Sequence, residues 1–213
     1  MADEPMNDTQ SNSALQSVCV YCGSGPGKNP AYVDAARALG GILAKSRIAL
    51  VYGGGSLGLM GETARAVLNH GGHVTGIIPG FLSEREHMLI QAQELIVVDD
   101  MHQRKQLMFV KSDAFVALPG GLGTLEEFVE QLTWSQLGRH TKPIVLLNIE
   151  GFWNPLLVLF DRMGAEGFIR PGLELNMLVV DRVEDIIPTI DQALGLYPAP
   201  GEAQVEAEVS AKF

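Results

Sequence analysis

The sequence predicts a doubly wound α/β sandwich, in which helices cover both faces of a mainly parallel sheet. Short runs rich in β-branched residues alternate with longer segments of helical periodicity along the chain. The predicted strands are apolar on both faces, as buried parallel strands are. Glycine clusters follow several of these strands, where parallel sheets place their ligand-binding turns.

Each element is predicted from its own stretch of sequence, in chain order. Strands are expected near residues 17–21, 48–52, 73–78, 94–98, 114–118, 143–147 and 177–180. Helices are expected between them, near residues 30–45, 57–70, 101–111, 124–138, 154–163 and 183–195. The order β-α repeated along the chain favours parallel strands joined by helical crossovers.

The size of the chain predicts a single domain. With 213 residues, of which 46% are hydrophobic, it can bury one substantial core. Residues 1–14 and 198–213 are polar, acidic or small, so they bury too little apolar surface to offset the entropy of ordering them. We expect two disordered tails around one domain at residues 15–197.

Charge and patterning exclude several classes of partner. The net charge of −10 disfavours binding to nucleic acid or to anionic membranes, and no basic cluster compensates for it. The first residues are acidic rather than basic and then apolar, and no apolar run reaches the roughly 18 residues of a membrane span. We expect a cytoplasmic protein.

The spacing of cysteines and histidines predicts no metal site. Cys19 and Cys22 form a C-x-x-C pair, a spacing found in zinc and redox motifs. They fall on a predicted strand, where positions 19 and 22 point to opposite faces and cannot hold one metal. The five histidines lack HxxxH or HExxH spacing. Both cysteines are therefore interpreted as small apolar residues.

Four glycine segments each follow a predicted strand: residues 22–27, 53–58, 79–80 and 119–123. Because the carboxyl ends of parallel strands share one edge of the sheet, these segments predict a single pocket for an anion or a nucleotide. The candidate contacts to a phosphate are Ser24, Gly54, Gly55 and Gly120.

Gly53, Gly55 and Gly58 also fit the dinucleotide motif G-x-G-x-x-G. That motif requires an acidic residue about 20 positions further on, at the end of the next strand. The sequence has Ile78, Pro79 and Gly80 there. A tight turn that leaves room for a ligand is the preferred interpretation.

Residues 117–128, ALPGGLGTLEEF, place a glycine-rich turn before a predicted helix. The backbone N–H groups and the dipole at such a helix start favour an anion. Thr124 and Glu127 also fit a capping box, in which the threonine caps the helix and the glutamate reaches back to it. On these residues alone, capping is the preferred interpretation.

Helical periodicity assigns the two faces of this helix. One apolar stripe consists of Leu125, Phe128, Val129 and Leu132. Glu127 points away from that stripe, on the same side as Trp134, so it is not expected in the core. An outward tryptophan is typical of an interface, so we expect a homodimer contact here, with Glu127 at the edge of a groove partly lined by a second subunit.

Arg104 and Lys105 lie on the helix predicted at residues 101–111, where they could supply the local positive charge that the acidic chain otherwise lacks. Arg104 steps onto an apolar part of the helix surface. It could equally lay its stem along that surface and send its charged end to water.

Several of these motifs occur together in one family. The segments PGGLGTLEE, MHQRK, VYGGGSLGLMG and LTWSQLG resemble the LONELY GUY family of cytokinin riboside 5′-monophosphate phosphoribohydrolases, often labelled "lysine decarboxylases". The likeness runs from about residue 18 to residue 180. It implies a Rossmann-like homodimer that hydrolyses the N-glycosidic bond of N6-substituted AMP, giving free base and ribose 5-phosphate without a metal or redox cofactor.

The resemblance also implies the site. The catalytic pair would be Arg104 and Glu127. Substrate contacts would fall on Glu86, Lys105, Gly121, Leu122, Gly123, Thr124, Leu125, Glu126 and Thr133. The family usually has P-R-E where this chain has Glu84-Arg85-Glu86, and often an aromatic residue in place of Leu122, which weakens any inference about base preference.

This chemistry explains a carboxylate beside an anion-binding turn. Cleavage of the ribosyl C–N bond builds positive charge on the sugar, and a carboxylate can stabilise that charge or activate the attacking water. We assign this role to Glu127, while Glu126 is either a lesser contact or only favourable to the helix dipole. Arg104 would hold the phosphate or stabilise charge as the base departs, because a guanidinium does not give up its proton.

Two other functions stay open. A lysine decarboxylase would need pyridoxal phosphate on a Schiff-base lysine, for which Lys105 is the candidate nearest the site. A carrier of a nucleotide or other phosphorylated cofactor would use the same pocket without catalysis. The presence of both Arg104 and Glu127 favours hydrolysis, because binding alone does not require a carboxylate near an anionic ligand.

Overall fold

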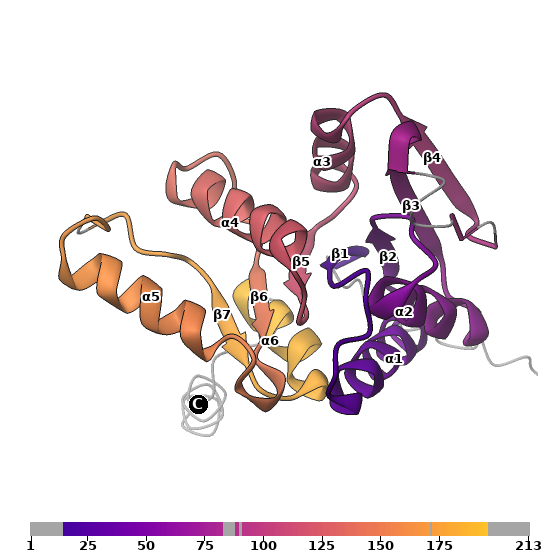
Figure 1. The fold of residues 1–213 in the computed structure, drawn as a ribbon, viewed down its shortest axis with the longest axis horizontal. Coiled ribbons are helices and arrows are strands. Elements are labelled where there is room, and N and C mark those ends of the chain that lie inside the picture. The colour runs from indigo at the N-terminus through magenta and orange to yellow at the C-terminus, as the bar shows by residue number, and fades with distance from the viewer. Residues whose placement is uncertain (1–14, 83–87, 90, 171, 196–213) are drawn as a thin grey trace, which may run out of the picture.

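The computed structural model describes residues 15–82, 88–89, 91–170 and 172–195 (Figure 1). A seven-stranded sheet crosses the molecule in the order β4-β3-β2-β1-β5-β6-β7, and all neighbouring strands are parallel. The strands are β1 (Ser17–Tyr21), β2 (Ala49–Tyr52), β3 (Val74–Pro79), β4 (Glu94–Val98), β5 (Ala114–Ala117), β6 (Ile144–Leu147) and β7 (Leu178–Val180). The predicted doubly wound sheet is confirmed.

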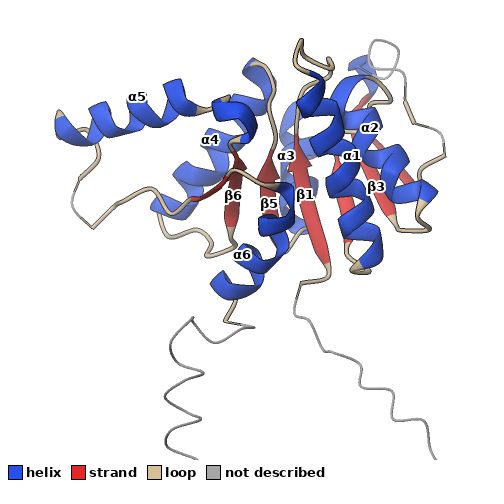
Figure 2. Cartoon of the chain, turned by 90° about the horizontal axis from the view of Figure 1, so that it is seen from below, coloured by secondary structure: helices blue, strands red, loops and turns tan. Residues whose placement is uncertain are grey.

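Helices cover both faces of this sheet (Figures 1 and 2). One face carries α1 (Pro30–Lys45), α2 (Gly58–Asn69) and α6 (Ile186–Ala193). The opposite face carries α3 (Met101–Val110), α4 (Leu122–Gln136) and α5 (Asn154–Ala165). Short 3-10 turns η1 (Gly80–Leu82), η2 (Ile149–Gly151) and η3 (Val183–Asp185) complete the described elements.

Two apolar clusters, one on each face of the sheet, form the core. Alternation along β1 sends Val20 and Cys22 into the cluster below α1 and α2, and Cys19 and Tyr21 into the cluster below α4. The two cysteines therefore lie on opposite faces, as predicted, and both are buried free thiols.

Most predicted boundaries agree with the structure to within one or two residues, but the N-cap of α4 is not the predicted one. The helix begins at Leu122 with Gly121 as its N-cap, and no side chain caps it. Thr124 is instead buried and packs on Gly120, where an added Cβ would lie 2.1 Å from its Oγ1. The capping-box interpretation is therefore wrong.

The reversal of strand order lies between β1 and β5. From β1 the chain adds strands outward on one side, and from β5 it adds them on the other. The loops that leave these two strands are bonded together: Gly23 donates its N–H to Pro119 (3.1 Å), and Leu118 donates to Tyr21 (2.9 Å). Two glycine segments far apart in sequence thus meet at one edge of the sheet, where doubly wound folds bind ligands.

No helix in the described part of the chain has the length and apolarity needed to cross a membrane.

Candidate active site

A cavity of about 240 Å³ opens at this reversal point. The loop after β1 and the first turns of α4 form two of its sides, and α2 and α3 contribute the others. Its lining consists of Val20, Tyr21, Cys22, Gly23, Ser24, Gly53, Met60, Met101, Arg104, Gly121, Leu122, Gly123, Thr124, Glu126 and Glu127.

Arg104 and Glu127 form a buried ion pair in this cavity. Arg104 Nη2 lies 3.5 Å from Glu127 Oε1, and the two side chains are only 7% and 9% exposed. The residues come from different helices, α3 and α4. Buried charges are tolerated in a fold only when they are paired. The ion pair is therefore an integral part of the site.

Helical periodicity predicts Glu127 outside the core, but in the structure its side chain is buried. The buried face of α4 consists of Thr124, Glu127, Phe128, Gln131 and Leu132, whereas Val129 is exposed. The helix is therefore turned so that Glu127 faces the cavity and Arg104 rather than solvent. Glu127 is buried, and it lines the cavity beside Arg104.

Gly53 makes the position of Arg104 possible. A Cβ on Gly53 would lie 2.1 Å from Arg104 Nη2 and 3.2 Å from the Met60 sulfur. Arg104 Nη1 also lies 3.8 Å from the sulfur of Met101. The guanidinium thus lies against the bare backbone of Gly53, with the Met101 sulfur beside its Nη1.

The glycines at the start of α4 have a different use. Gly121 has φ −94°, neither it nor Gly123 has a positive φ, and a Cβ on either would meet nothing within 4 Å. Neither backbone conformation nor internal packing requires glycine at these positions. Their missing side chains leave the N-terminal backbone of α4 open to a ligand, in the position where helices bind phosphates.

The G-x-G-x-x-G segment serves packing. At the start of α2, Leu59 and Met60 donate their N–H groups to the Gly23 carbonyl, at 3.0 and 3.4 Å. Gly58 has φ +56°, and a Cβ there would lie 2.3 Å from the Ser24 carbonyl carbon. Because these N–H groups already donate to a carbonyl of the protein, they disfavour the binding of a dinucleotide pyrophosphate here. Gly54 and Gly55, predicted phosphate contacts, do not line the cavity.

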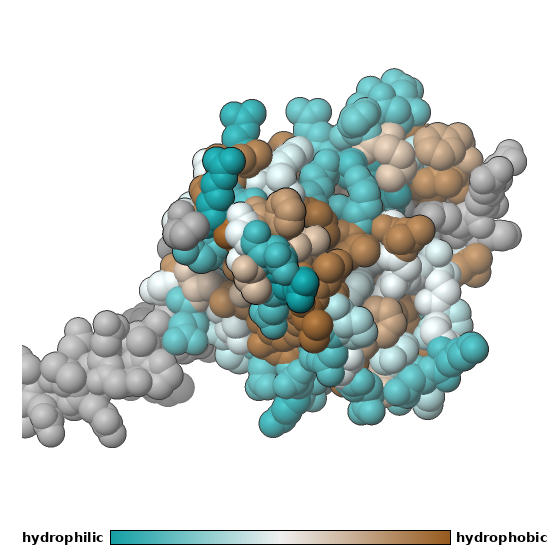
Figure 3. Space-filling view, turned by 60° about the vertical axis from the view of Figure 1, so that its left-hand side comes forward, coloured by the Kyte–Doolittle hydropathy of each residue, from teal (hydrophilic) through white to brown (hydrophobic). Residues whose placement is uncertain are grey.

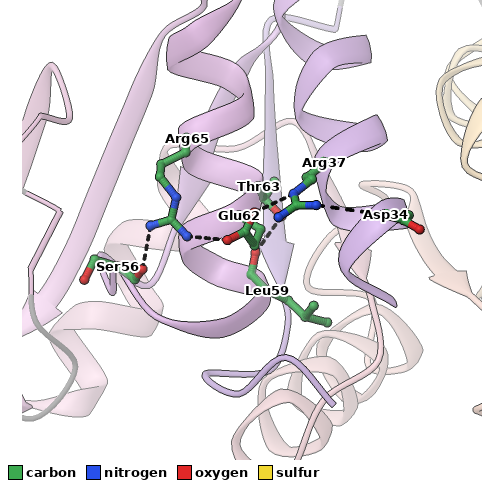
Figure 4. Close-up of polar contacts among 7 residues, drawn as sticks. All are labelled: Asp34, Arg37, Ser56, Leu59, Glu62, Thr63 and Arg65. Atoms are coloured by element: carbon green, nitrogen blue, oxygen red, sulfur yellow. Dashed lines mark hydrogen bonds and ion pairs between the residues drawn. The ribbon is translucent and has the colours of Figure 1, made fainter. Parts of the chain in front are cut away.

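A network of ion pairs and hydrogen bonds anchors the glycine segment at residues 53–58 to the neighbouring helices (Figure 4). Arg65 donates to the Ser56 carbonyl at 2.8 Å and to Glu62 at 2.6 Å. Glu62 also accepts from Arg37 of α1 at 2.6 Å. The glycine segment that supports Arg104 is therefore tied to both α1 and α2.

The structure brings many of the predicted site residues together: Ser24, Arg104, Gly121, Leu122, Gly123, Thr124, Glu126 and Glu127 all line the cavity. Leu125 and Gly120 do not line it. Glu86 lies outside the described residues.

Lys105 and Thr133 lie away from this cavity. Lys105 bonds to Glu126 and Glu130, and it lines a second, larger depression between α3 and α4, here named the α3–α4 groove. The groove is lined by His102, Lys105, Gln106, Phe109, Val110, Glu130, Trp134, Leu137 and Arg139. Thr133 is exposed and donates its hydroxyl to the Val129 carbonyl. Substrate contact by either residue stays a prediction.

Sequence reasoning missed the residues that shape the cavity without carrying charge, notably Gly53, Met60 and Met101. Gly53 was visible as the first glycine of its motif, but its purpose depends on a side chain about fifty positions away. Nothing in the local pattern marks the two methionines, which are common as core residues.

The surroundings of the cysteines in and near the cavity disfavour a role as nucleophiles. Burial raises the pKa of the Cys22 thiol far above its ordinary value, and the negative charge of Glu127 raises it further; Cys19 is shifted in the same direction for the same reasons. Both thiols thus stay protonated.

Among the described residues, no group of three or more His, Cys, Asp or Glu side chains could hold a metal.

Comparison with known proteins identifies the family of this chain. Residues 60–190 match the family model described as "Possible lysine decarboxylase". A probable cytokinin riboside 5′-monophosphate phosphoribohydrolase of Oryza sativa subsp. japonica, LOGL9, is 52% identical over 78% of this chain and 74% of its own. The cytokinin riboside 5′-monophosphate phosphoribohydrolase LOG7 of Arabidopsis thaliana is 45% identical over 86% of this chain and 84% of its own.

Among solved structures, the molybdenum cofactor carrier protein of Chlamydomonas reinhardtii has the same fold. It matches with a TM-score of 0.63 and 25% identity, over 84% of this chain and 98% of its own. Its likeness in sequence is about half that of the plant proteins. The chain therefore belongs to the LOG family of cytokinin riboside 5′-monophosphate phosphoribohydrolases.

Proposed function

We propose that this protein hydrolyses the N-glycosidic bond of a nucleoside 5′-monophosphate with an adenine-type base, N6-substituted as in a cytokinin ribotide. The products are the free base and ribose 5-phosphate. The named activity of the plant relatives supports this reaction, and the cavity has the groups that it needs. We place the reaction in the cytoplasm.

Binding begins with the phosphate. The open backbone of Gly121, Leu122 and Gly123 at the start of α4 is the proposed anion site, with Ser24 on the facing loop. Thr124, buried one turn into the helix, fixes the turn by packing on Gly120. A phosphate held here directs the ribose along α4 toward Glu127.

Catalysis then falls to the ion pair. Glu127 stabilises the oxocarbenium-like sugar, or accepts a proton from the attacking water, as the C–N bond breaks. Arg104 pairs with that carboxylate and orients it in the ground state, and it offers its guanidinium to the phosphate or the departing base. Water supplies the hydroxyl on the anomeric carbon, and its proton goes to the base.

The buried Arg104–Glu127 pair beside an uncapped helix start is the observation that carries the proposal. The test is incubation of the purified protein with AMP and with isopentenyl-AMP, followed by chromatography of the free base. Release of base from either nucleotide is the expected result, and E127Q should lose it by about 10³-fold or more while still binding AMP. Wild-type turnover in E127Q would refute the assignment.

A non-catalytic carrier is the second candidate, and the shared fold with a molybdenum cofactor carrier favours its consideration. A carrier binds an anion more weakly when a carboxylate lines its site, unless that carboxylate has another task. Binding of nucleotide without any base release, in both wild type and E127Q, would favour the carrier.

A pyridoxal phosphate decarboxylase has little support. No lysine is among the residues lining the cavity. Lys105 is bonded to two glutamates, and Lys142 donates to the carbonyls of Phe109 and Ser112. An absorbance scan for a bound aldimine would decide this alternative.

We also propose that the protein forms a homodimer through the α3–α4 groove, close to the catalytic cavity. Trp134 is half-buried against Phe109, at 5.3 Å between ring centroids, and Leu137 and Val110 beside it are each 66% exposed. Figure 3 shows apolar surface on the side to which α4 and α5 project. A second subunit would cover the α3–α4 groove and could bring Thr133 close to a bound nucleotide.

A further inference from the structure

Helix α3 carries Arg104, yet few of its side chains are buried against the rest of the protein. The helix lies between α4 and the β3–β4 end of the sheet (Figure 1). Of its ten side chains, Arg104 and Met108 are buried, and Leu107 and Phe109 are partly buried. Because one of the two buried groups is the charged arginine itself, apolar packing alone fixes this helix weakly. The position of Arg104 therefore depends on polar contacts of α3.

Lys142, just before β6, makes such a contact at the C-terminal end of α3. Its Nζ donates hydrogen bonds to the Phe109 carbonyl at 2.7 Å and to the Ser112 carbonyl at 2.6 Å. The last four carbonyls of a helix lack partners within it, and a lysine can bind them. The Ser112 hydroxyl in turn donates to the Met108 carbonyl at 2.8 Å. Lys142 thus ties the end of α3 to the sheet.

The same ammonium also lies over the ring of Phe109, at 4.1 Å from its centroid. That ring is enclosed by Phe115 of β5, Trp134 of α4 and His140, at centroid distances of 5.9, 5.3 and 5.2 Å. A cation over an aromatic ring adds attraction to the hydrogen bond at the carbonyl of the same residue. Lys142 therefore holds Phe109 at two points, its backbone and its ring.

We propose that Lys142 is a positioning residue for the reaction: by fixing Phe109 and the end of α3, it holds the Arg104 guanidinium at Glu127. Phe109 follows Arg104 by five residues, little more than one helical turn, so a shift at the end of the helix reaches the arginine. Lys142 does not line the cavity, so it acts without touching the substrate. This inference rests on the proposed function.

A charged donor suits this role. Burial lowers the pKa of Lys142, and the negative charge of Asp113 opposes that shift. Removing a cation from water destabilises a fold unless the cation is bonded, and here two carbonyls accept from it. Hydrogen bonds from a charged donor are about twice as strong as those between neutral groups. The contact is therefore a stiff connection between α3 and the start of β6.

The variant K142M keeps an unbranched apolar side chain beside the Phe109 ring but removes both hydrogen bonds. Its turnover rate with isopentenyl-AMP should fall about 10-fold or more, because a displacement of about 1 Å in a catalytic group costs about 100-fold. Thermal melting checks that the variant is folded, and K142Q replaces K142M should the latter not fold.

K111M is the matched control, since it also removes a lysine from the C-terminal end of α3. The Lys111 ammonium pairs with Glu94 at 3.1 Å, and both side chains are at least one-third exposed, at 33% and 42%. Surface ion pairs contribute little, so the turnover rate of K111M should stay within about twofold of wild type. Equal losses in K111M and K142M, or no loss in K142M, would overturn the proposal.

A double-variant cycle decides whether Lys142 acts through Arg104. R104Q removes the guanidinium that Lys142 is proposed to position, and its slow base release is measured at high protein concentration. Adding K142M to R104Q should lower the turnover rate by no more than about twofold, because effects that pass through one group are not additive. A further loss of about 10-fold in this background would show that Lys142 acts elsewhere in the protein and would contradict its role.

Hydrogen exchange of the full chain, followed by mass spectrometry, separates this inference from the proposed function. K142M should speed the exchange of backbone amides at residues 105–110, while those of α2, on the opposite face of the sheet, exchange as in the wild type. Unchanged exchange in α3 would overturn the positioning role. Absence of base release by the wild type would instead refute hydrolysis, and faster exchange in α3 would still support the connection through Lys142.

Discussion

Gly53 illustrates how a single residue position can determine a site without touching a ligand. Arg104 occupies the space where a side chain at position 53 would be, so the glycine is required by a contact between β2 and α3. The sequence alone predicts a tight turn here that leaves room for a ligand. Only the three-dimensional contact separates a glycine that makes room for a protein side chain from one that makes room for a ligand.

G53A should therefore act on catalysis more than on stability. The added methyl group would lie 2.1 Å from Arg104 Nη2, so the guanidinium must shift away from Glu127. Misplacement of a catalytic group by about 1 Å typically costs about 100-fold, so we expect the turnover rate to fall by about 10- to 100-fold. Steady-state base release measures this fall.

G164A is the matched control. Gly164 lies in α5, and a Cβ there meets nothing within 4 Å. Alanine should leave the turnover rate unchanged and stabilise the helix by up to about 1 kcal/mol. A G53A enzyme that turns over at the wild-type rate would show that Arg104 does not depend on the bare backbone of Gly53.

At the scale of single residues, the sequence identified the charged side chains of the site but not the groups with which they pair. Arg104 and Glu127 stood out by motif, and both line the cavity. The burial of Glu127 and the pairing of Lys105 with Glu126 could not be predicted, because both depend on how α3 packs beside α4. That packing is set by contacts far apart in the chain, which no local spacing records.

At the scale of elements, His140 links α4 to the approach to β6. Lys142 donates its N–H to Nδ1 (3.1 Å), so Nε2 carries the proton and donates to the Gln131 carbonyl (3.2 Å). Burial lowers the pKa of His140; the Gln131 carbonyl opposes that shift, and the positive charge of Lys142 reinforces it. The fold therefore favours the neutral ring.

The lowered pKa of His140 makes stability depend on pH. Because the folded pKa lies below the unfolded value of about 6.5, the contribution of His140 is complete above that value and is lost as pH falls through the folded pKa. The urea midpoint should fall between pH 7.5 and pH 5, and by less in H140Q. Exposed His70 supplies the control: H70Q should show the full fall, and an equal fall in H140Q would contradict the assignment.

Asp113 joins β1 to the start of β5. Its Oδ2 accepts hydrogen bonds from the N–H groups of Gln16 and Ser17 and from the Ser17 hydroxyl, at 3.0, 2.9 and 2.9 Å. D113A should lower the free energy of unfolding by about 2 kcal/mol, since bonds to a charged acceptor are lost. Urea unfolding measures it.

D161A, at an exposed position of α5, should change stability by no more than about 0.5 kcal/mol. Equal losses in the two variants would mean that the bonds of Asp113 contribute nothing specific.

The elements themselves were largely predictable, because period-2 and period-3.6 patterns differ and because glycine and proline mark their ends. The start of α4 was not. Thr124 has the chemistry of a cap, yet the N-cap is Gly121, three residues earlier, and no side chain caps the helix. This helix start is the proposed anion site, and functional sites are where local rules are expected to fail.

At the scale of the whole molecule, parallel pairing and the single sheet followed from apolar strands joined by helices. The position of the strand reversal, between β1 and β5, did not follow from local pattern. Only that reversal explains why the loops at Gly23 and Pro119 meet, and hence why the cavity lies between them.

The proposed dimer yields a paired prediction at this scale. Leu137 in the α3–α4 groove and Val158 on α5 are each 66% exposed. L137D should give a monomer by light scattering, because a charge in an apolar interface cannot be desolvated without a partner. V158D should stay dimeric. A monomeric V158D with a dimeric L137D would move the interface to α5.

The most direct test of the central claim is a crystal structure of E127Q with isopentenyl-AMP bound. The account predicts the anomeric carbon within about 4 Å of the side chain at position 127, and the phosphate against the backbone N–H groups of residues 122–124. A sugar bound elsewhere, or a side chain at 127 bonded only within its own helix, would contradict it.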